Sequence, residues 1–197
     1  DLIIGLRDMA EPEGFAALVA RRLTHEPISH IIGTRDFWTL TLNVTRDVLT
    51  PRPDSETLIE AAVAHFAGTA GAKRILDLGT GSGALLLAAL SEWPQATGLG
   101  IDISAAALEV ARGNAERCSL AARAELRIGN WFEGVDERFD IILANPPYIA
   151  IDARLPRDVA EYEPHLALFA GTDGLDAYRI LAPALSAHLA LGGMAAV

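Results

Sequence analysis

The sequence has little cysteine, little basic charge and no long apolar run. Cys118 is the one cysteine in 197 residues, which excludes an internal disulfide framework and a metal site built from several cysteines. The five histidines are scattered without zinc-ligand spacing beside a carboxylate cluster, so we predict no metal site. No apolar segment could span a bilayer and no signal peptide is present, which predicts a cytoplasmic protein without a membrane partner.

The charge balance is acidic, with 26 Asp and Glu against 16 Lys and Arg and a net charge of −10. This balance gives no global basic field, so we expect no direct nucleic-acid partner. A hydrophobic content of 51% with 21% charged residues is typical of a folded globular protein. The length predicts one core domain with an accessory segment.

From residue 74 onward, short apolar runs alternate with helical patterns. The alternating elements are predicted strands at 74–78, 97–103, 125–128, 139–144 and from 193, and predicted helices at 81–93, 105–118 and 173–189. We expect Pro183 to kink the last helix or divide it in two. This alternation predicts an α/β fold with a doubly wound, Rossmann-like parallel sheet.

The chain before residue 74 follows a different pattern. Residues 11–23 carry a helical apolar face, and Glu26-Pro27 ends that helix. Residues 37–48 are rich in β-forming side chains, which predicts a short hairpin or edge strands. A helix is predicted at 56–66, with Asp54 or Ser55 as its cap.

A glycine-rich turn follows the first strand of the predicted sheet. Gly79, Gly81 and Gly83 alternate with Thr80 and Ser82, which permits a sharp turn and a close approach of a ligand. The next helix begins here, and its first N–H groups are available to a ligand. The sequence therefore predicts a nucleoside site, with a plain strand-to-helix turn as the alternative.

Three side chains near this turn bear on the kind of nucleoside. Asp102 ends the second strand, where a carboxylate can accept hydrogen bonds from both ribose hydroxyls. Asp77 precedes the glycines; it would repel a pyrophosphate and attract a cationic amino group or sulfonium, or it only bonds local amides. Trp131 follows the third strand and either lines an adenine slot or closes the core. Asp77 favours S-adenosylmethionine over NAD.

The strand at 139–144 ends at Asn145-Pro146-Pro147-Tyr148. Two prolines cannot continue a sheet ladder, and they hold the preceding backbone stiffly. The Asn145 side-chain carbonyl and the Pro146 backbone carbonyl are then two fixed acceptors, which match the two hydrogens of a planar –NH2 group. Tyr148 adds a flat face that can pack on a planar substrate. The alternative is a rigid exit from the sheet.

The motifs at 77–83 and 145–148 together resemble those of S-adenosylmethionine-dependent amino-methyltransferases. The segments 26–33, 37–38 and 50–56 are similar to those of the peptide chain release factor glutamine N5-methyltransferases, and this resemblance extends from about Glu26 to the end. It implies S-adenosylmethionine as cofactor, S-adenosylhomocysteine as product, and the Gly-Gly-Gln glutamine of a class I release factor as substrate.

The resemblance and the arguments above give a set of expected site residues. The residues expected at the cofactor are Asp77, Gly79, Thr80, Gly81, Ser82, Gly83, Asp102, Ile103, Trp131 and Asn145. Those expected at the substrate are Arg52, Asn145, Pro146, Pro147 and Tyr148, with catalysis assigned to Asn145, Pro146 and Tyr148. For Arg52 a solvated ion pair is the alternative.

The resemblance also predicts a division of the chain into three parts. Residues 1–34 are expected to be the remnant of an N-terminal helical, substrate-binding domain, 35–50 a linking β-hairpin, and 51–197 a methyltransferase domain without its C-terminal strands. The alternative functions are glutamine methylation of a ribosomal protein, adenine-N6 methylation of a nucleic acid, and an NAD-dependent or non-catalytic nucleotide-binding module.

Overall fold

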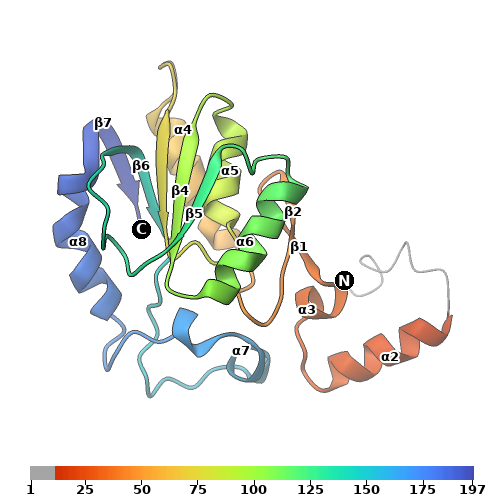
Figure 1. Cartoon of the computed structure of the whole chain (residues 1–197). Coiled ribbons are helices and arrows are strands. Elements are labelled where there is room, and N and C mark those ends of the chain that lie inside the picture. The colour runs from red at the N-terminus through yellow and green to blue at the C-terminus, as the bar shows by residue number, and fades with distance from the viewer. Residues whose placement is uncertain (1–11) are drawn as a thin grey trace.

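A five-stranded parallel sheet forms the centre of the computed structural model, which describes residues 12–197 (Figure 1). The strands lie in the order β5-β4-β3-β6-β7. Their bounds are β3 Arg74–Leu78, β4 Thr97–Asp102, β5 Ala124–Ile128, β6 Phe139–Ala144 and β7 Leu189–Ala196. From β3 the chain continues to β4 and β5 on one side of it and then returns to β6 and β7 on the other, so the strand order reverses at β3. This order confirms the doubly wound, Rossmann-like α/β fold.

Helices cover both faces of the sheet. One face packs against α4 Glu56–His65, α5 Ala84–Glu92 and α6 Ala105–Arg117, and the other against α8 Asp176–His188. Alternate side chains of each strand therefore enter different cores. Ile75 and Ile141 lie in the first core, whereas Leu76 and Ile142 lie in the second, and all four are fully buried. The predicted division of the last helix is wrong, because α8 contains Pro183 and continues through it.

An antiparallel hairpin precedes the sheet, with β1 Thr34–Phe37 paired to β2 Leu40–Asn43. The prediction at 37–48 placed the hairpin several residues too late, because Trp38 lies in the turn with φ 55°. Two hydrogen bonds join this turn to α4 and α5. The Trp38 backbone N–H donates to Glu56 Oε1 at 2.9 Å, and its indole N–H donates to Glu92 Oε1 at 2.7 Å.

The N-terminal helices and the segment between β6 and α8 lie near one end of the sheet (Figure 1). The described part of the N-terminal segment forms α2 Pro12–Leu23 and α3 Ile28–Ile32, while residues 1–11, part of the predicted helical region, lie outside the described residues. The sequence did not predict α7 Arg157–Tyr162 or the 3-10 turn His165–Ala167. The Tyr162 hydroxyl donates to the Thr24 carbonyl at 3.0 Å, so α7 contacts the end of α2.

Candidate functional site

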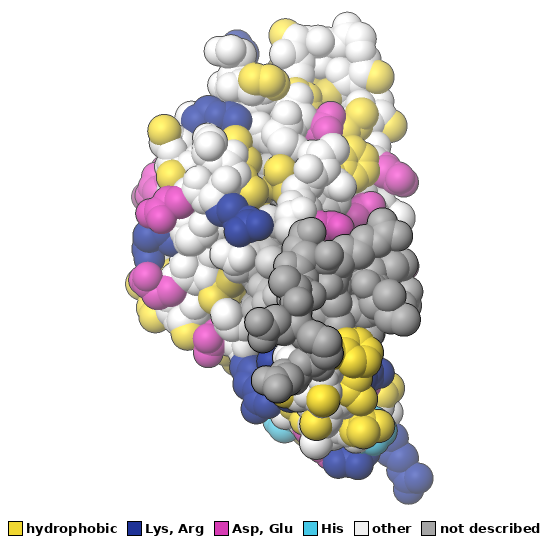
Figure 2. Space-filling model, turned by 90° about the vertical axis from the view of Figure 1, so that its right-hand side faces the viewer, with side chains coloured by type: hydrophobic (Ala, Val, Ile, Leu, Met, Phe, Trp, Pro, Cys, Tyr) yellow, Lys and Arg dark blue, Asp and Glu magenta, His cyan; other side chains and the backbone are white. Residues whose placement is uncertain are grey.

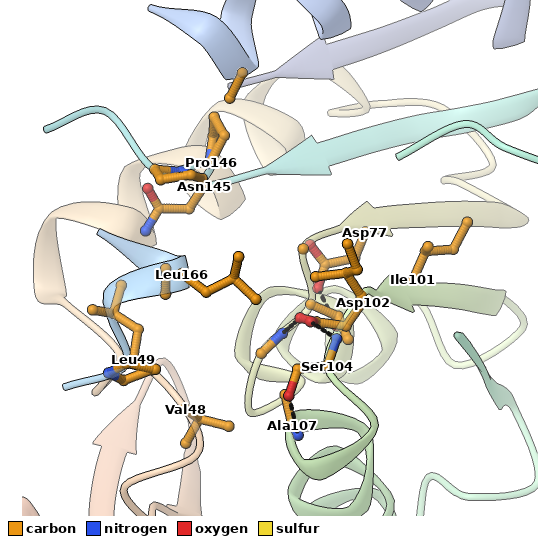
Figure 3. Close-up of a pocket in the computed structure, with 18 of the residues that line it drawn as sticks. Val48, Leu49, Asp77, Ile101, Asp102, Ser104, Ala107, Asn145, Pro146 and Leu166 are labelled. Carbon is orange, nitrogen blue, oxygen red and sulfur yellow. Dashed lines mark hydrogen bonds between the residues drawn. The ribbon is translucent and has the colours of Figure 1, made fainter. Parts of the chain in front are cut away.

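A cavity of about 380 Å³ lies at the carboxyl edge of the sheet, where the strand order reverses. Figure 3 shows Asp77, Asp102 and Ser104 on one side of it and Asn145 with Pro146 on the other. The predicted site residues that line this cavity are Arg52, Asp77, Gly79, Thr80, Gly81, Ser82, Asp102, Ile103, Trp131, Asn145, Pro146 and Pro147. Gly83 and Tyr148 lie outside the lining, and the Tyr148 side chain is exposed.

The glycine loop turns sharply and is bonded to β4. Gly79, Gly81 and Gly83 have φ values of 71°, 55° and 82°, which favour glycine over any residue with a Cβ atom. The Gly79 N–H donates to the Ile101 carbonyl at 2.8 Å, and the Gly81 N–H donates to Asp102 Oδ2 at 2.8 Å. The Gly83 N–H donates to the Thr80 carbonyl at 2.8 Å, so two of the N–H groups expected to be free at the start of the next helix, those of Gly81 and Gly83, are bonded inside the protein.

Asp102 accepts backbone hydrogen bonds on both carboxylate oxygens. Oδ2 takes the Gly81 N–H, and Oδ1 takes the Ser104 N–H at 2.9 Å. A carboxylate has about four acceptor positions, so both oxygens retain capacity for ligand hydroxyls. Ser104 in turn caps α6, because its hydroxyl accepts from the Ala107 N–H at 3.2 Å. The carboxylate is thus held rigidly at the cavity wall.

Asp77 is almost fully buried below the glycine loop. Its Oδ2 accepts from the Thr80 hydroxyl at 2.6 Å and from the Leu86 N–H at 3.2 Å. Its Oδ1 is buried and has no hydrogen-bond partner in the described part of the chain. Burial raises the pKa of Asp77 to about 7; the Thr80 and Leu86 bonds lower it in part, and nearby Asp102 raises it. Oδ2 therefore bonds the Thr80 hydroxyl and the α5 backbone, whereas Oδ1 is buried without a hydrogen bond from the described residues.

Trp131 lies at the same edge with its backbone at φ 52°. Its ring packs against the core on the α8 face of the sheet and also lines the cavity. A Cβ atom on Gly79 would lie 3.5 Å from this ring. The aromatic ring thus closes the sheet end and forms part of the cavity wall, so both interpretations of Trp131 remain compatible with its position.

Asn145 and Pro146 present two oxygens at the opposite wall. The Asn145 side-chain NH2 donates to Ser55 Oγ at 3.0 Å. Within the described residues, neither Asn145 Oδ1 nor the Pro146 carbonyl accepts a hydrogen bond. The chain then continues through Ile149, whose N–H donates to the Leu168 carbonyl at 3.0 Å. The two acceptors expected from the motif are therefore unoccupied by protein donors.

Ser55 was interpreted from the sequence as a helix cap, and this prediction is wrong. The residue occupies the N-cap position of α4, but neither its side chain nor that of Asp54 caps the helix. Its hydroxyl faces Asn145 instead, across 90 positions of sequence. Ser55 also lines the cavity, so it belongs to the site.

Arg52 forms an ion pair, the alternative given for it from the sequence, with a buried partner that the sequence did not identify. Its Nη2 donates to both carboxylate oxygens of Glu163 at 2.9 Å. The Glu163 side chain is 1% exposed and the Arg52 side chain 39%. Burial raises the pKa of Glu163, while the charge and hydrogen bond of Arg52 and a hydrogen bond from Thr50 lower it in part. Arg52 thus joins the loop before α4 to the segment after α7, and its predicted substrate contact stays a prediction.

Asn114 is a further residue that the sequence analysis missed. It is fully buried on α6, and its NH2 group donates to the Ser82 carbonyl at 2.9 Å and the Asn43 carbonyl at 3.0 Å. Its Oδ1 accepts from the Asn43 N–H at 2.7 Å. An asparagine inside a helical pattern carries no local signal for such a link. The glycine loop and the hairpin are thereby held together.

Two kinds of feature are absent from the described residues. Among residues 12–197, no group of three or more His, Cys, Asp or Glu side chains is placed to hold a metal ion. No helix within that range has both the length and the apolar character needed to cross a membrane.

The chain is similar to known methyltransferases in sequence. The family model described as the methyltransferase small domain matches residues 54–160. A release factor glutamine methyltransferase of Cereibacter sphaeroides is 48% identical over 98% of this chain and 69% of its own length. The release factor glutamine methyltransferase of Rhodospirillum rubrum is 50% identical over 95% of this chain and 58% of its own length. The chain thus spans about two thirds of the curated relatives that it matches.

Solved structures show the same fold at lower identity. The ribosomal protein L11 methylase of Lactobacillus delbrueckii subsp. bulgaricus has a TM-score of 0.50 and 24% identity, over 73% of this chain and 59% of that one. The catalytic domain of hMettl16, solved with an RNA hairpin, has a TM-score of 0.56 and 17% identity, over 76% and 58% of the two chains. At these identities the likeness concerns the fold alone.

Proposed function

The chain belongs to the release factor glutamine methyltransferases, and from this premise we propose that it methylates N5 of a glutamine side chain with S-adenosylmethionine as donor. The glutamine is that of the Gly-Gly-Gln motif in a class I peptide chain release factor. The observation that carries the proposal is a pair of acceptors, Asn145 Oδ1 and the Pro146 carbonyl, which accept no hydrogen bond from residues 12–197 and lie at a cavity that the glycine loop also lines. Such a substrate places the activity in the cytoplasm.

The cavity residues fit the donor molecule. Asp102 has acceptor capacity for ribose hydroxyls, and Trp131 and Ile103 offer apolar surface for the adenine. The buried Oδ1 of Asp77, which has no hydrogen-bond partner among the described residues, fits a cationic amino group that would supply this hydrogen bond and favour the ionised carboxylate. When bound, the donor supplies an electrophilic methyl group on a sulfonium, and no residue of the chain needs to activate it further.

The protein's task is then to make a carboxamide nitrogen nucleophilic. This nitrogen is a poor nucleophile because its lone pair is delocalised into the carbonyl. Asn145 Oδ1 and the Pro146 carbonyl would accept its two hydrogens, orient it toward the methyl group, and offset the positive charge that develops on it. The surplus proton leaves after methyl transfer, when the nitrogen has become acidic. Tyr148, exposed beside this pair, would contact the substrate loop.

We assign the described N-terminal segment, 12–34, to the surface that helps to hold the release factor. Its helices α2 and α3 lie at the end of the molecule where α7 lies, and Tyr162 of α7 contacts Thr24. The net charge of −10 disfavours the adenine-N6 alternative. In Figure 2 acidic and basic side chains are mixed on the upper part of the face, while several basic side chains gather at its lower end.

The test is mass spectrometry of a full-length class I release factor after incubation with the full-length enzyme and S-adenosylmethionine. We expect one added methyl group, located by fragmentation on the glutamine of Gly-Gly-Gln. A release factor with asparagine in place of that glutamine is the matched control and should remain unmodified. Methylation of a ribosomal protein or of adenine in an oligonucleotide, with an unmodified release factor, would overturn the proposal.

A further inference from the structure

The contact between Ser55 and Asn145 has a consequence for catalysis. An asparagine amide carries an acceptor on one side and a donor on the other, and a half-turn of its last torsion exchanges them. The proposed function needs the acceptor toward the substrate. We propose that Ser55 is a positioning residue that fixes the Asn145 amide with Oδ1 facing the substrate nitrogen. This inference rests on the proposed function and deepens it.

The hydrogen bond itself supports the assignment. Asn145 Nδ2 donates to Ser55 Oγ at 3.0 Å, and this is the one hydrogen bond that the Asn145 side chain makes to the described residues. With Nδ2 turned to Ser55, Oδ1 is the atom left for a ligand. The reversed amide would place its own NH2 group against the substrate NH2 group, so two donors would face each other and the Pro146 carbonyl alone would accept from the substrate nitrogen.

The local backbone explains why Ser55 can serve this role. Ser55 ends a short 3-10 helix, Pro53–Ser55, whose first residue is fixed in φ by its ring. Although Ser55 precedes α4, its φ of −71° and ψ of −15° are helical, and its hydroxyl caps no helix amide. The hydroxyl is therefore not needed by the helix and lies at the cavity wall.

Asn145 is held from the other side by its own sequence. The following residue, Pro146, restricts the backbone of Asn145 and lacks an N–H. Covalent geometry thus restricts the backbone, whereas the side-chain amide makes its one hydrogen bond within the described residues to Ser55. The two acceptors are therefore positioned differently. The local backbone positions the Pro146 carbonyl, whereas Asn145 Oδ1 is positioned through Ser55, 90 residues earlier in the sequence.

Three substitutions separate a positioning role from a structural one. Ser55→Val and Ser55→Thr have nearly the same size, but only threonine keeps a hydroxyl, and Ser55→Ala removes the hydroxyl without adding bulk. We expect kcat for release factor methylation to fall roughly 10-fold or more in the Val and Ala variants, the scale for losing an orienting partner, and to stay near wild type in the Thr variant.

The Kd for S-adenosylmethionine and the melting temperature should remain unchanged in all three variants, because the hydroxyl contacts neither the glycine loop nor a helix amide in the structure. The inference is overturned if the Ala or Val variant keeps the wild-type kcat, or if the Thr variant is as slow as the Val variant. A wild-type enzyme that leaves the release factor unmodified would instead overturn the proposed function, so the two failures are distinguishable.

Discussion

The two walls of the cavity use their polar atoms in opposite ways. On the wall that we propose for the cofactor, formed by Asp77, the glycine loop and Asp102 and called the cofactor wall below, Asp102 accepts two backbone N–H bonds, and the loop donates to β4 and to that carboxylate. On the wall that we propose for the substrate, formed by Ser55, Asn145 and Pro146 and called the substrate wall below, the Asn145 NH2 group donates to Ser55. The Asn145 oxygen, beside the Pro146 carbonyl, accepts no hydrogen bond from the described residues. Hydrogen bonds within the protein thus hold the cofactor wall in place without a ligand, whereas the acceptors of the substrate wall remain for the substrate.

This difference predicts that substitutions in the two walls change different quantities, the Kd for the donor and the rate of the chemical step. A damaged cofactor wall should weaken binding of the donor, because its bonds shape the nucleoside site. A damaged substrate wall should slow the chemical step, because its acceptors are needed most when charge develops on the nitrogen. The following substitutions test the separation.

The largest effect is expected from Asn145→Ala on the substrate wall. Removal of one preorganised acceptor should lower kcat by roughly 10²-fold or more, while the Kd for S-adenosylmethionine changes much less. Single-turnover methylation of the release factor and calorimetry with the cofactor measure the two quantities. Near-normal single-turnover rates would contradict the role of Asn145.

A somewhat smaller effect is expected from Asp102→Ala on the cofactor wall. Loss of charged hydrogen bonds to the ribose should weaken S-adenosylmethionine binding by about 10- to 100-fold, and kcat at saturating cofactor should fall less. Asp102→Asn is the matched control, because it keeps the shape and one acceptor, and it should be intermediate. The comparison of the two walls fails if Asn145→Ala weakens cofactor binding more than Asp102→Ala does.

Asp77 gives a pH-dependent test of the cofactor wall. Its pKa is raised from 3.8 to about 7 by burial, so between these values the folded protein keeps a proton that the unfolded chain releases. Stability from this group is therefore present below 3.8 and is lost as the pH rises toward 7.

The variant Asp77→Asn lacks this titration. We expect melting temperatures of the cofactor-free protein to shift in favour of the variant as the pH rises from about 4 to about 7, and the difference to level off above that. In the wild type, S-adenosylmethionine should bind more tightly as the carboxylate ionises over the upper part of that range. A pH-independent difference between the two proteins would refute the buried-proton account.

The smallest effect is expected from Glu163→Gln, which removes the charge that pairs with Arg52. Because the Arg52 side chain is 39% exposed, solvent screens the pair, and the loss should be about 1 kcal/mol of unfolding free energy, or about 2–4 °C in melting temperature. Arg52→Lys keeps the charge but not the two-oxygen contact, and it should cost less. A higher melting temperature in the glutamine variant would show that burial of Glu163 outweighs its pairing.

The two walls also differ in how far the sequence predicts them. The cofactor wall comes from residues that end neighbouring strands, such as Asp102 and the glycine loop, and local spacing is enough to bring them together. The substrate wall joins Ser55 to Asn145 across 90 positions, and the ion pair nearby joins Arg52 to Glu163 across 111. No local pattern encodes such pairs, since they depend on the packing of the finished fold.

Two errors in the predicted secondary structure arise where local sequence does not decide the backbone. A run of β-forming residues extends past Phe37 and conceals the turn, because Trp38 adopts a positive φ that its type rarely takes. The segment after Tyr148 has neither a strand nor a helix period, and its short helix α7 is held in place by contacts to distant residues, including Thr24. Propensity is a weak guide where tertiary contacts decide the backbone.

The most direct test of the central claim is a crystal structure of the full-length enzyme with S-adenosylhomocysteine and a Gly-Gly-Gln-containing release factor. The account predicts that the glutamine side-chain nitrogen lies about 3 Å from both Asn145 Oδ1 and the Pro146 carbonyl oxygen, with Asn145 Nδ2 still on Ser55. A glutamine whose nitrogen points away from these two oxygens, or an Asn145 amide turned with its NH2 group toward the substrate, would contradict it.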